Sequence, residues 1–539
     1  MPLALVVASI AFAPTIAQEP LFAGLGHHHR AITTSSPLAQ RYFDQGLAFL
    51  YGFNHDEAIR SFTQATVLDP QCAMAWWGIA TANGPHINNP MVDPDHAKAA
   101  LNALKRAQGL RANPVERALI SAASTRFADA MPADRSGLDR AFANAMRSVW
   151  KRFPRDADVG AIFAESMMDL RPWDLWKADG SPQPGTLEIV ATLQRDLRLD
   201  PNHPLANHLY VHAMEGSPHP ERSLASADRL RFMEPGLGHM VHMPSHTYVR
   251  TGQWLDAIQA NERAIKVDRA YREKVPNQGF YRIYMAHNQH MLAYAAMMRG
   301  ESRVAIGQID SMLKVFPEDW LKEAAPLVDG FLAMPFEVRV RFGQWDGVLD
   351  LPDVPDYFPL ARTMRHGARA IAYAAKGDVE NARSEQSLFF AAKAKVPAGA
   401  TFGNNSGSGL LTVAANLMNG EIALAEKRMG SALDSLRAAV KAEDQLRYDE
   451  PPDWIQPTRH TLGAVLVKAG KFAEAEAVYR ADLKKLPHNG WSLFGLARTL
   501  HGLGHNAEAK RVDAQFAKAW KDADIQIQSS CLCVKGEHS

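Results

Sequence analysis

The sequence of 539 residues has few cysteines, no excess of charge of either sign and no long apolar run. Three cysteines, Cys72, Cys531 and Cys533, are too few for a scaffold held together by disulfides. Lys and Arg number 59 and Asp and Glu 58, so the net charge of +1 gives no electrostatic reason to expect a nucleic-acid partner. No run reaches the ~18 apolar residues that a membrane-spanning helix needs. We therefore expect no nucleic acid and no membrane span in the mature chain.

Length sets a second limit. A single hydrophobic core seldom grows beyond roughly 250–300 residues, so the chain must divide into domains or extend as a repeat array. Apolar residues make up 47% of the sequence and charged residues 22%, a balance that is typical of folded proteins and not of long disordered segments.

The first residues indicate an exported protein. Residues 3–13 form an apolar stretch that has the length of a signal peptide and is too short to cross a bilayer. Thr15 and Ala17 then place small residues at the −3 and −1 positions of a cleavage site, and a polar chain follows. We expect a signal peptide over residues 1–17 and a periplasmic or secreted mature protein. The alternative is a buried or anchoring segment.

The chain contains internal repeats. A tetratricopeptide unit of 34 residues pairs two helices and places small residues, one large residue and a proline at fixed positions. Residues 39–72 match positions 8, 20, 24, 27 and 32 with Gly46, Ala58, Phe62, Ala65 and Pro70. Units that begin at residues 456 and 490 match as well, and a five-residue step from glycine to alanine recurs at Gly252/Ala257, Gly300/Ala305 and Gly377/Ala382. The sequence therefore predicts an all-α tetratricopeptide-like solenoid of ten or eleven helix pairs.

The repeats divide the chain after residue 17 into four expected parts. They are an N-terminal extension, an N-terminal array with a histidine-rich groove, a C-terminal array and a polar tail, at residues 18–38, 39–300, 301–523 and 524–539. The tail carries Cys531 and Cys533, for which a disulfide-like pair, a metal thiolate pair and an inert tail all remain open.

Four stretches rich in proline, glycine and asparagine are expected to be loops that interrupt the repeats. They are residues 84–95, 171–185, 268–281 and 395–409. Insertions into a solenoid often lie together on the binding face, although they can also be tolerated surface excursions. Trp173 and Trp176 indicate that the second loop packs on another part of the protein.

Histidine is unevenly distributed. Of the 21 histidines, nine lie within residues 203–290, where even spacing would place about three. Seven of them recur at intervals of three or four residues, which puts each set on one helix face at ~100° per residue. These seven are His208, His212, His239, His242, His246, His287 and His290.

The repeat register brings the three sets together. They fall in the first helices of units that begin at Pro204, Gly238 and Ala286, and the likeness to tetratricopeptide proteins implies that these helices line a concave groove. Three carboxylates share this face: Glu165, Asp169 and Glu215. Pro244 interrupts the second set, so the helix either kinks there or begins there, which would leave His239 and His242 in the incoming loop.

This pattern predicts a transition-metal site. Neutral imidazole binds copper, zinc and iron, and carboxylates can complete the ligand set. Seven histidines exceed one tetrahedral set, so either two ions or one ion with further catalytic or substrate-binding histidines is expected. In a metal-dependent hydrolase or oxidoreductase, Glu165, Asp169 or Glu215 would be the general base.

The alternative function is a non-catalytic scaffold whose groove binds a peptide or partner protein through hydrogen bonds. Peptide-binding repeats usually place Asn, Lys and Arg in the groove, whereas this groove carries histidines and acids, which favours the metal. The ligand in the groove would be a small molecule or a peptide.

Three other histidine positions are weaker candidates. The run His27–His29 precedes the first repeat and is expected to be solvated, although it could cap the groove. His86 lies in the first loop and could reach the site. His55 lies in the turn between two helices, where we expect a structural hydrogen bond.

Several segments resemble a family of exported bacterial tetratricopeptide-repeat proteins. The likeness rests on FNHDEAIRSF, AMAWWGIATANGPHIN, NHLYVHAMEGSPHPE, GHMVHMPSHTYVRTGQW and YMAHNQHM, and it covers most of residues 24–300. It implies the helical-repeat fold and export. It implies no reaction, cofactor or catalytic residue.

Overall fold

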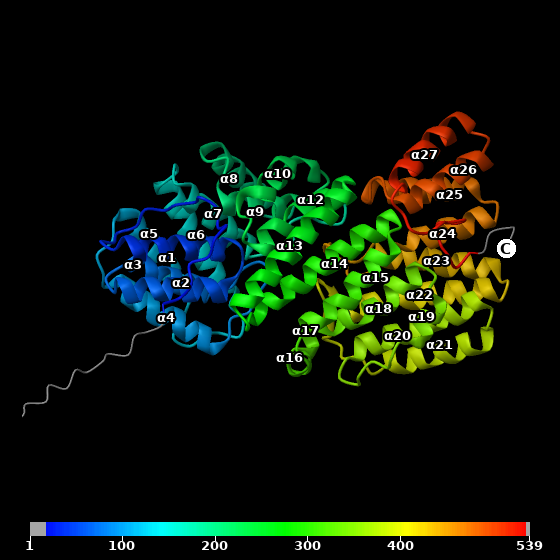
Figure 1. Ribbon diagram of the computed structural model, residues 1–539, viewed down its shortest axis with the longest axis horizontal. Coiled ribbons are helices and arrows are strands. Elements are labelled where there is room, and N and C mark those ends of the chain that lie inside the picture. Colours follow the sequence, from blue (N-terminus) through cyan, green and yellow to red (C-terminus); the bar gives the residue numbers. More distant parts are fainter. Residues whose placement is uncertain (1–17, 535–539) are drawn as a thin grey trace, which may run out of the picture.

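The computed structural model describes residues 18–534, and the predicted signal peptide at residues 1–17 lies outside the described residues. The chain is an all-helical, tetratricopeptide-like solenoid of paired helices, which confirms the predicted fold class. In Figure 1 the chain advances from the N-terminal helices at one end of the long axis to the C-terminal helices at the other. Within the described residues, no helix is both long and apolar enough to span a membrane.

The first part of the solenoid runs from α1 to α15. Its helices are α1 Pro37–Tyr51, α2 His55–Leu68, α3 Ala73–Ala82, α4 Pro94–Gln108, α5 Pro114–Ala123, α6 Ser136–Arg152, α7 Ala157–Met168, α8 Thr186–Leu199, α9 Pro204–Glu215, α10 Leu224–Met233, α11 Gly238–His242, α12 Pro244–Thr251, α13 Trp254–Lys274, α14 Arg282–Arg299 and α15 Ser302–Met312.

The second part contains the remaining helices and one short hairpin. Its elements are α16 Glu318–Glu323, α17 Ala325–Val328, α18 Met334–Arg341, α19 Trp345–Asp350, α20 Pro359–Lys376, α21 Val379–Lys393, β1 Thr401–Phe402, β2 Asn405–Ser406, α22 Gly407–Ala425, α23 Met429–Glu443, α24 Thr458–Lys468, α25 Phe472–Lys485, α26 Gly490–Gly502 and α27 Asn506–Ala519. Short 3₁₀ turns link several helices, at Ser124–Arg126, Pro220–Ser223, Gly279–Tyr281, Leu313–Val315 and Asp329–Ala333.

The step from glycine to alanine marks the turn within each helix pair. Gly252 ends α12 with a left-handed φ of 77°, and Gly300 ends α14 with a φ of 74°, a conformation that glycine adopts without a steric penalty. Five residues later, Ala257 and Ala305 are fully buried in the second helix of each pair. The predicted register is therefore confirmed at these turns.

Glycine also lets paired helices cross closely. A methyl group on Gly46 of α1 would lie 2.4 Å from the Phe62 ring of α2, and one on Gly463 of α24 would lie 2.4 Å from the Tyr479 ring of α25. Both glycines occupy position 8 and both aromatic residues position 24 of the repeat. The same packing therefore recurs near both ends of the chain.

The expected loops are present, with one correction. Residues 268–274 continue α13, so the interruption predicted at residues 268–281 begins only at Val275. The buried face of the helix extends this far, because Asp268 and Tyr271 are both buried and Asp268 accepts a hydrogen bond from Asn288 of α14. The loop at 395–409 contains the β1–β2 hairpin.

The last helix pairs pack back against the middle of the chain. The indole nitrogen of Trp491 donates to the Met297 carbonyl at 2.7 Å, and that of Trp254 donates to the Pro487 carbonyl at 2.8 Å. The C-terminal tail packs against α24, where Ser530 Oγ donates to the His460 carbonyl at 2.7 Å. Within the tail, a disulfide joins Cys531 to Cys533. The solenoid therefore closes partly on itself.

Replacing Gly46 by alanine tests the close helix crossing. Overpacking against Phe62 is expected to lower the free energy of unfolding by roughly 1–3 kcal/mol, measured by urea denaturation. The matched control is Gly307→Ala in α15, where a methyl group meets open space and should stabilise the helix by up to about 1 kcal/mol. Equal effects of the two substitutions would contradict this packing.

Candidate metal centre

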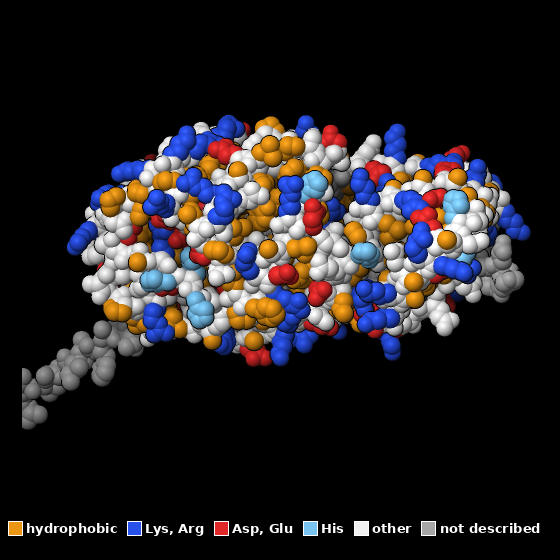
Figure 2. All heavy atoms as spheres, turned by 90° about the horizontal axis from the view of Figure 1, so that it is seen from above, with side chains coloured by type: hydrophobic (Ala, Val, Ile, Leu, Met, Phe, Trp, Pro, Cys, Tyr) orange, Lys and Arg blue, Asp and Glu red, His pale blue; other side chains and the backbone are white. Residues whose placement is uncertain are grey.

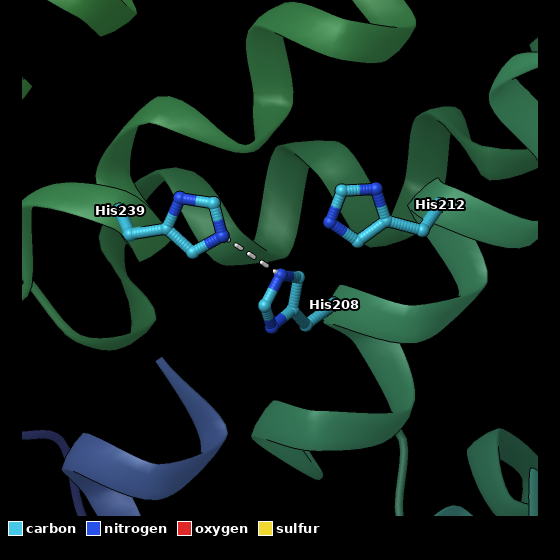
Figure 3. A group of neighbouring side chains, drawn as sticks. All are labelled: His208, His212 and His239. Atoms are coloured by element: carbon cyan, nitrogen blue, oxygen red, sulfur yellow. Dashed lines mark hydrogen bonds between the residues drawn. The ribbon is translucent and has the colours of Figure 1, made fainter. Parts of the chain in front are cut away.

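Three histidines from two helices converge in the N-terminal array. His208 and His212 lie one turn apart on α9, and α11 brings His239 toward them (Figure 3). One ring nitrogen from each lies within 4.8 Å of the others. His239 Nε2 is 3.2 Å from His208 Nε2, and two nitrogens bound to one tetrahedral ion lie about 3.3 Å apart. This set, here named triad 1, could hold a metal ion.

The other ring nitrogens of α9 already have acceptors. His208 donates from Nδ1 to the Tyr51 carbonyl at 2.7 Å, and His212 donates from Nδ1 to Glu215 Oε1 at 2.7 Å. Because a neutral imidazole carries one proton, each Nε2 atom is left with a lone pair. His212 Nε2 is buried and has no hydrogen-bond partner among the described residues. Metal-binding histidines usually donate their second ring N–H to such acceptors.

A second set, here named triad 2, contains His242, His246 and His287. One nitrogen from each ring again lies within 4.8 Å of the others. His242 donates from Nδ1 to Asn261 Oδ1 at 2.6 Å, and the orientation of this amide is fixed because its nitrogen donates to a carbonyl of its own helix. His246 donates from Nδ1 to Glu215 Oε2 at 2.5 Å.

The two Nε2 atoms of triad 2 face each other. His242 Nε2 and His246 Nε2 are 2.8 Å apart, although both Nδ1 atoms are the donors of their rings. Two lone pairs at this distance repel unless a proton or a metal ion lies between them. The added proton would create a buried imidazolium, whereas a metal ion would use both lone pairs.

One carboxylate supports both triads. Glu215 accepts from His212 through one oxygen and from His246 through the other, and its side chain is only 2% exposed. Burial by itself would raise the pKa of Glu215, but the His246 and His212 rings lower it to about 2, so the group is ionised. Because each oxygen accepts from a different histidine, Glu215 orients the His212 and His246 rings.

Burial keeps most of these rings neutral. It lowers the pKa of His212, and it lowers four further histidine pKa values well below 6.5, those of His208, His239, His242 and His287. His246 differs, because the charge of Glu215 outweighs burial and raises its pKa. A nitrogen must be unprotonated to bind a metal, so neutral rings favour ligation.

Pro244 lies between the two helical turns that carry His242 and His246, and these histidines remain close together. It occupies the first turn of α12, where a missing N–H costs no helical hydrogen bond. The helix therefore begins at Pro244, as one of the two predicted geometries has it, but His239 and His242 lie in the short helix α11 and not in a loop.

The histidines form one wall of a cavity of about 430 Å³. His212, His239, His246, His287 and His290 line it. His290 belongs to neither triad, and its buried Nε2 has no hydrogen-bond partner in the described part of the chain. The structure therefore brings all seven predicted histidines into one region. Six of them form the two triads, and His290 lies outside both.

All four predicted loops reach this cavity. Asn88, Trp173, Phe280 and Phe402 come from the first, second, third and fourth loops, and all four line it. The Trp173 indole nitrogen donates to Asn88 Oδ1 at 3.0 Å, and its ring lies edge-on to His212 with the ring centres 5.3 Å apart. Trp176 donates to the Ala213 carbonyl at 2.8 Å. The second loop therefore packs over triad 1, as its tryptophans indicated.

The C-terminal array supplies a wall that the sequence did not reveal. Asp449, Glu450 and Asp453 line the cavity from the segment between α23 and α24. Glu450 is 3% exposed, its Oε1 has no hydrogen-bond partner among the described residues, and burial raises its pKa to about 8. No spacing rule connects this segment with the histidines, because it reaches them only through closure of the solenoid.

Glu165 and Asp169 lie away from the histidine wall. Asp169 forms an ion pair with Arg126 and lines a neighbouring cavity, and Glu165 lines neither. Burial raises the pKa of Glu165 to about 8 and that of Asp169 to about 7. The structure does not bring these two carboxyls to the triads; Asp169 instead pairs with Arg126, whose guanidinium lies over the Phe142 ring of α6.

The remaining candidate histidines, His86, His55 and His28, occupy different positions in the N-terminal array. The His86 ring packs against the Phe53 ring with the ring centres 4.7 Å apart, and the centre of the Phe53 ring lies 4.4 Å from that of His208. His55 donates to the Ala82 carbonyl at 2.9 Å, the structural bond expected of it. His28 is mostly buried and contacts Asp158 Oδ1 at 3.0 Å. The prediction that the His27–His29 run is solvated is therefore wrong for His28.

One family model and several solved structures match the chain. A family model described as tetratricopeptide repeat matches residues 43–83. A chain of the APC/C hetero-tetramer Cut9–Hcn1 is 12% identical with a TM-score of 0.32, and the match covers 90% of this chain and 76% of that one. Human IFIT1 dimers with m7Gppp-AAAA and with PPP-AAAA are 11% and 14% identical, both with a TM-score of 0.33, and the matches cover 90% and 88% of this chain and 91% and 88% of theirs. Superpositions this loose carry no functional conclusion, and comparison with curated proteins gives no match.

Glu215→Gln tests the shared carboxylate. A glutamine oxygen can accept from one histidine while its NH₂ group opposes the other N–H, so one ligand loses its orientation. We expect metal affinity to fall by about 10–100-fold in competition with a chelator. The matched control is Glu337→Gln, a buried carboxyl outside the cavity whose pKa is raised to about 8, which should leave metal affinity unchanged. Equal affinities in all three proteins would refute the shared role.

Proposed function

We propose that this protein is a metal-dependent enzyme of tetratricopeptide fold whose two histidine triads each hold one copper, zinc or iron ion. The observation that carries the proposal is the convergence of Nε2 lone pairs from rings whose Nδ1 protons are already donated to Tyr51, Glu215 and Asn261. Two separate sets of three nitrogens favour two ions over one.

Three imidazoles leave part of the coordination shell of each ion open. His212, His239, His246 and His287 also line the cavity, so the open positions would face it. An ion there would polarise a substrate or lower the pKa of a bound water. This access to a cavity favours catalysis, by a hydrolase or an oxidoreductase, over simple metal storage.

The cavity favours a small molecule as the ligand. A volume of about 430 Å³ lies within the usual range for small-molecule sites, and Trp173, Tyr284 and Phe402 supply apolar walls. Glu450 lines the same cavity and has an unpartnered oxygen, so we infer that it moves the proton in the reaction. It replaces Glu165 and Asp169 in this role.

Elemental analysis tests the two-ion proposal. Protein prepared without a His-tag or a nickel column is expected to contain close to two transition-metal ions per chain. His239→Ala and His287→Ala should each lose about one ion, because each removes one ligand of one triad. His219→Ala, which changes an exposed histidine of the same segment, should lose none. If the wild-type protein and all variants lack metal, the cavity is instead a binding site for a peptide or partner protein.

We also propose that the protein is exported and acquires its metal outside the cytoplasm. The support is the apolar stretch at residues 3–13 followed by Thr15 and Ala17. Mass spectrometry of the protein recovered from the periplasm or medium of the expressing cell should give a mature N-terminus near Gln18. Recovery of an uncleaved chain that begins at Met1 would contradict the proposal.

A further inference from the structure

Asp158 is a buried carboxylate at which three separate parts of the chain meet. Its Oδ1 accepts from the Tyr51 hydroxyl at 2.6 Å, from His28 at 3.0 Å and from His203 at 3.1 Å. Its Oδ2 accepts from Arg30 at 2.8 Å. Burial alone would raise the pKa of Asp158, but the bonds from His203 and His28 hold it well below its usual range.

Two of these donors lead directly to triad 1. Tyr51 is the last residue of α1, and its carbonyl, which has no partner within that helix, accepts from His208 Nδ1. His203 caps α9, because its Nδ1 accepts from the Ala206 N–H at 3.2 Å and its Nε2 is left to donate to Asp158. Asp158 therefore joins the end of the helix that supports His208 to the start of the helix that carries it.

The N-terminal extension completes this cluster. Arg30 is 9% exposed and also bonds both oxygens of Asp156, at 2.9 and 3.1 Å. His28 packs against the His203 ring with the ring centres 4.9 Å apart. A buried carboxylate with four donors is costly to disturb, so the extension is fixed to α7 and α9.

Triad 2 has no such support. Its ligands are held by Asn261 of α13 and by Glu215, and neither of these side chains contacts Asp158. The two triads can therefore be compared within one protein, with triad 2 as the internal control.

Resting on the proposed function, we propose that Asp158 is a positioning residue for triad 1, and that the N-terminal extension acts through His28 and Arg30 to hold it. By fixing Tyr51 and the start of α9, the cluster sets the direction of the His208 ring. It thereby determines the metal affinity of triad 1 and leaves that of triad 2 unchanged.

The experiment measures Co²⁺ affinity in two single-site backgrounds. His287→Ala leaves triad 1 intact and His239→Ala leaves triad 2 intact, and bound Co²⁺ is followed by its visible absorption in competition with a chelator. Asp158→Asn and Tyr51→Phe are added to each background. We expect about a tenfold loss of Co²⁺ affinity in the triad 1 background and no change in the triad 2 background.

The controls separate positioning from loss of fold. Tyr51→Phe keeps the carbonyl that accepts from His208 and removes only the bond to Asp158, so it remains informative if Asp158→Asn does not fold. The matched control is Tyr479→Phe, which removes a buried tyrosine hydroxyl that contacts Ser530 outside the cavity, and it should retain Co²⁺ affinity in both backgrounds.

Three outcomes would count against these proposals in different ways. If neither single-site background nor the wild-type protein binds Co²⁺, the proposed metal function is wrong. If the triad 1 background binds Co²⁺ and neither Asp158→Asn nor Tyr51→Phe weakens it, the positioning role alone is wrong. Equal weakening in both backgrounds would also overturn that role, because it would show a general loss of stability.

Discussion

A single carboxylate, Glu215, determines how the histidine centre is built. Its two oxygens accept N–H groups from His212 on α9 and His246 on α12, so two repeats are tied by one charged group that is almost completely excluded from water. Charge-assisted hydrogen bonds of this kind are stronger than neutral ones, and leaving such a group unpaired is costly. Glu215 thereby fixes the proton of His212 and that of His246 on Nδ1. The Nε2 atom of each ring keeps its lone pair, and both rings line the same cavity.

The part of this arrangement that sequence could predict is the local part. Helical spacing puts His208 and His212 on one face, and the 34-residue register aligns that face with the one carrying His242 and His246. These relations depend only on the rise and twist of a helix and on the stacking of identical units. The close helix crossing at Gly46 could also be predicted, because this glycine occupies a repeat position where a larger residue would meet the Phe62 ring of the paired helix.

The part that sequence could not predict depends on the curvature of the whole solenoid. Glu450 reaches the cavity from more than 150 residues beyond the last ligand because the C-terminal helices fold back, and small rotations between successive repeats add up over that distance. Glu165 and Asp169 were placed on the groove face by the register of the preceding unit, but that unit is interrupted by the loop at 171–185 between α7 and α8, and its carboxyls do not reach the triads. Asp158 was also missed, since its partners are 45 to 130 residues away in sequence.

One strained backbone position lies beside triad 1. Phe53 follows α1 with a left-handed φ of 56°, at the position of a helix-ending motif where glycine is usual. A bulky residue in this conformation costs of order 1–3 kcal/mol. The centre of its ring lies within about 6 Å of the ring centres of His208, His212 and His239, so the strained conformation places an apolar aromatic ring against triad 1. Glycine at position 53 would relieve the strain but would remove this aromatic ring. Under the proposed metal function, the apolar Phe53 ring would keep water away from these three histidines, and that benefit would offset the strain.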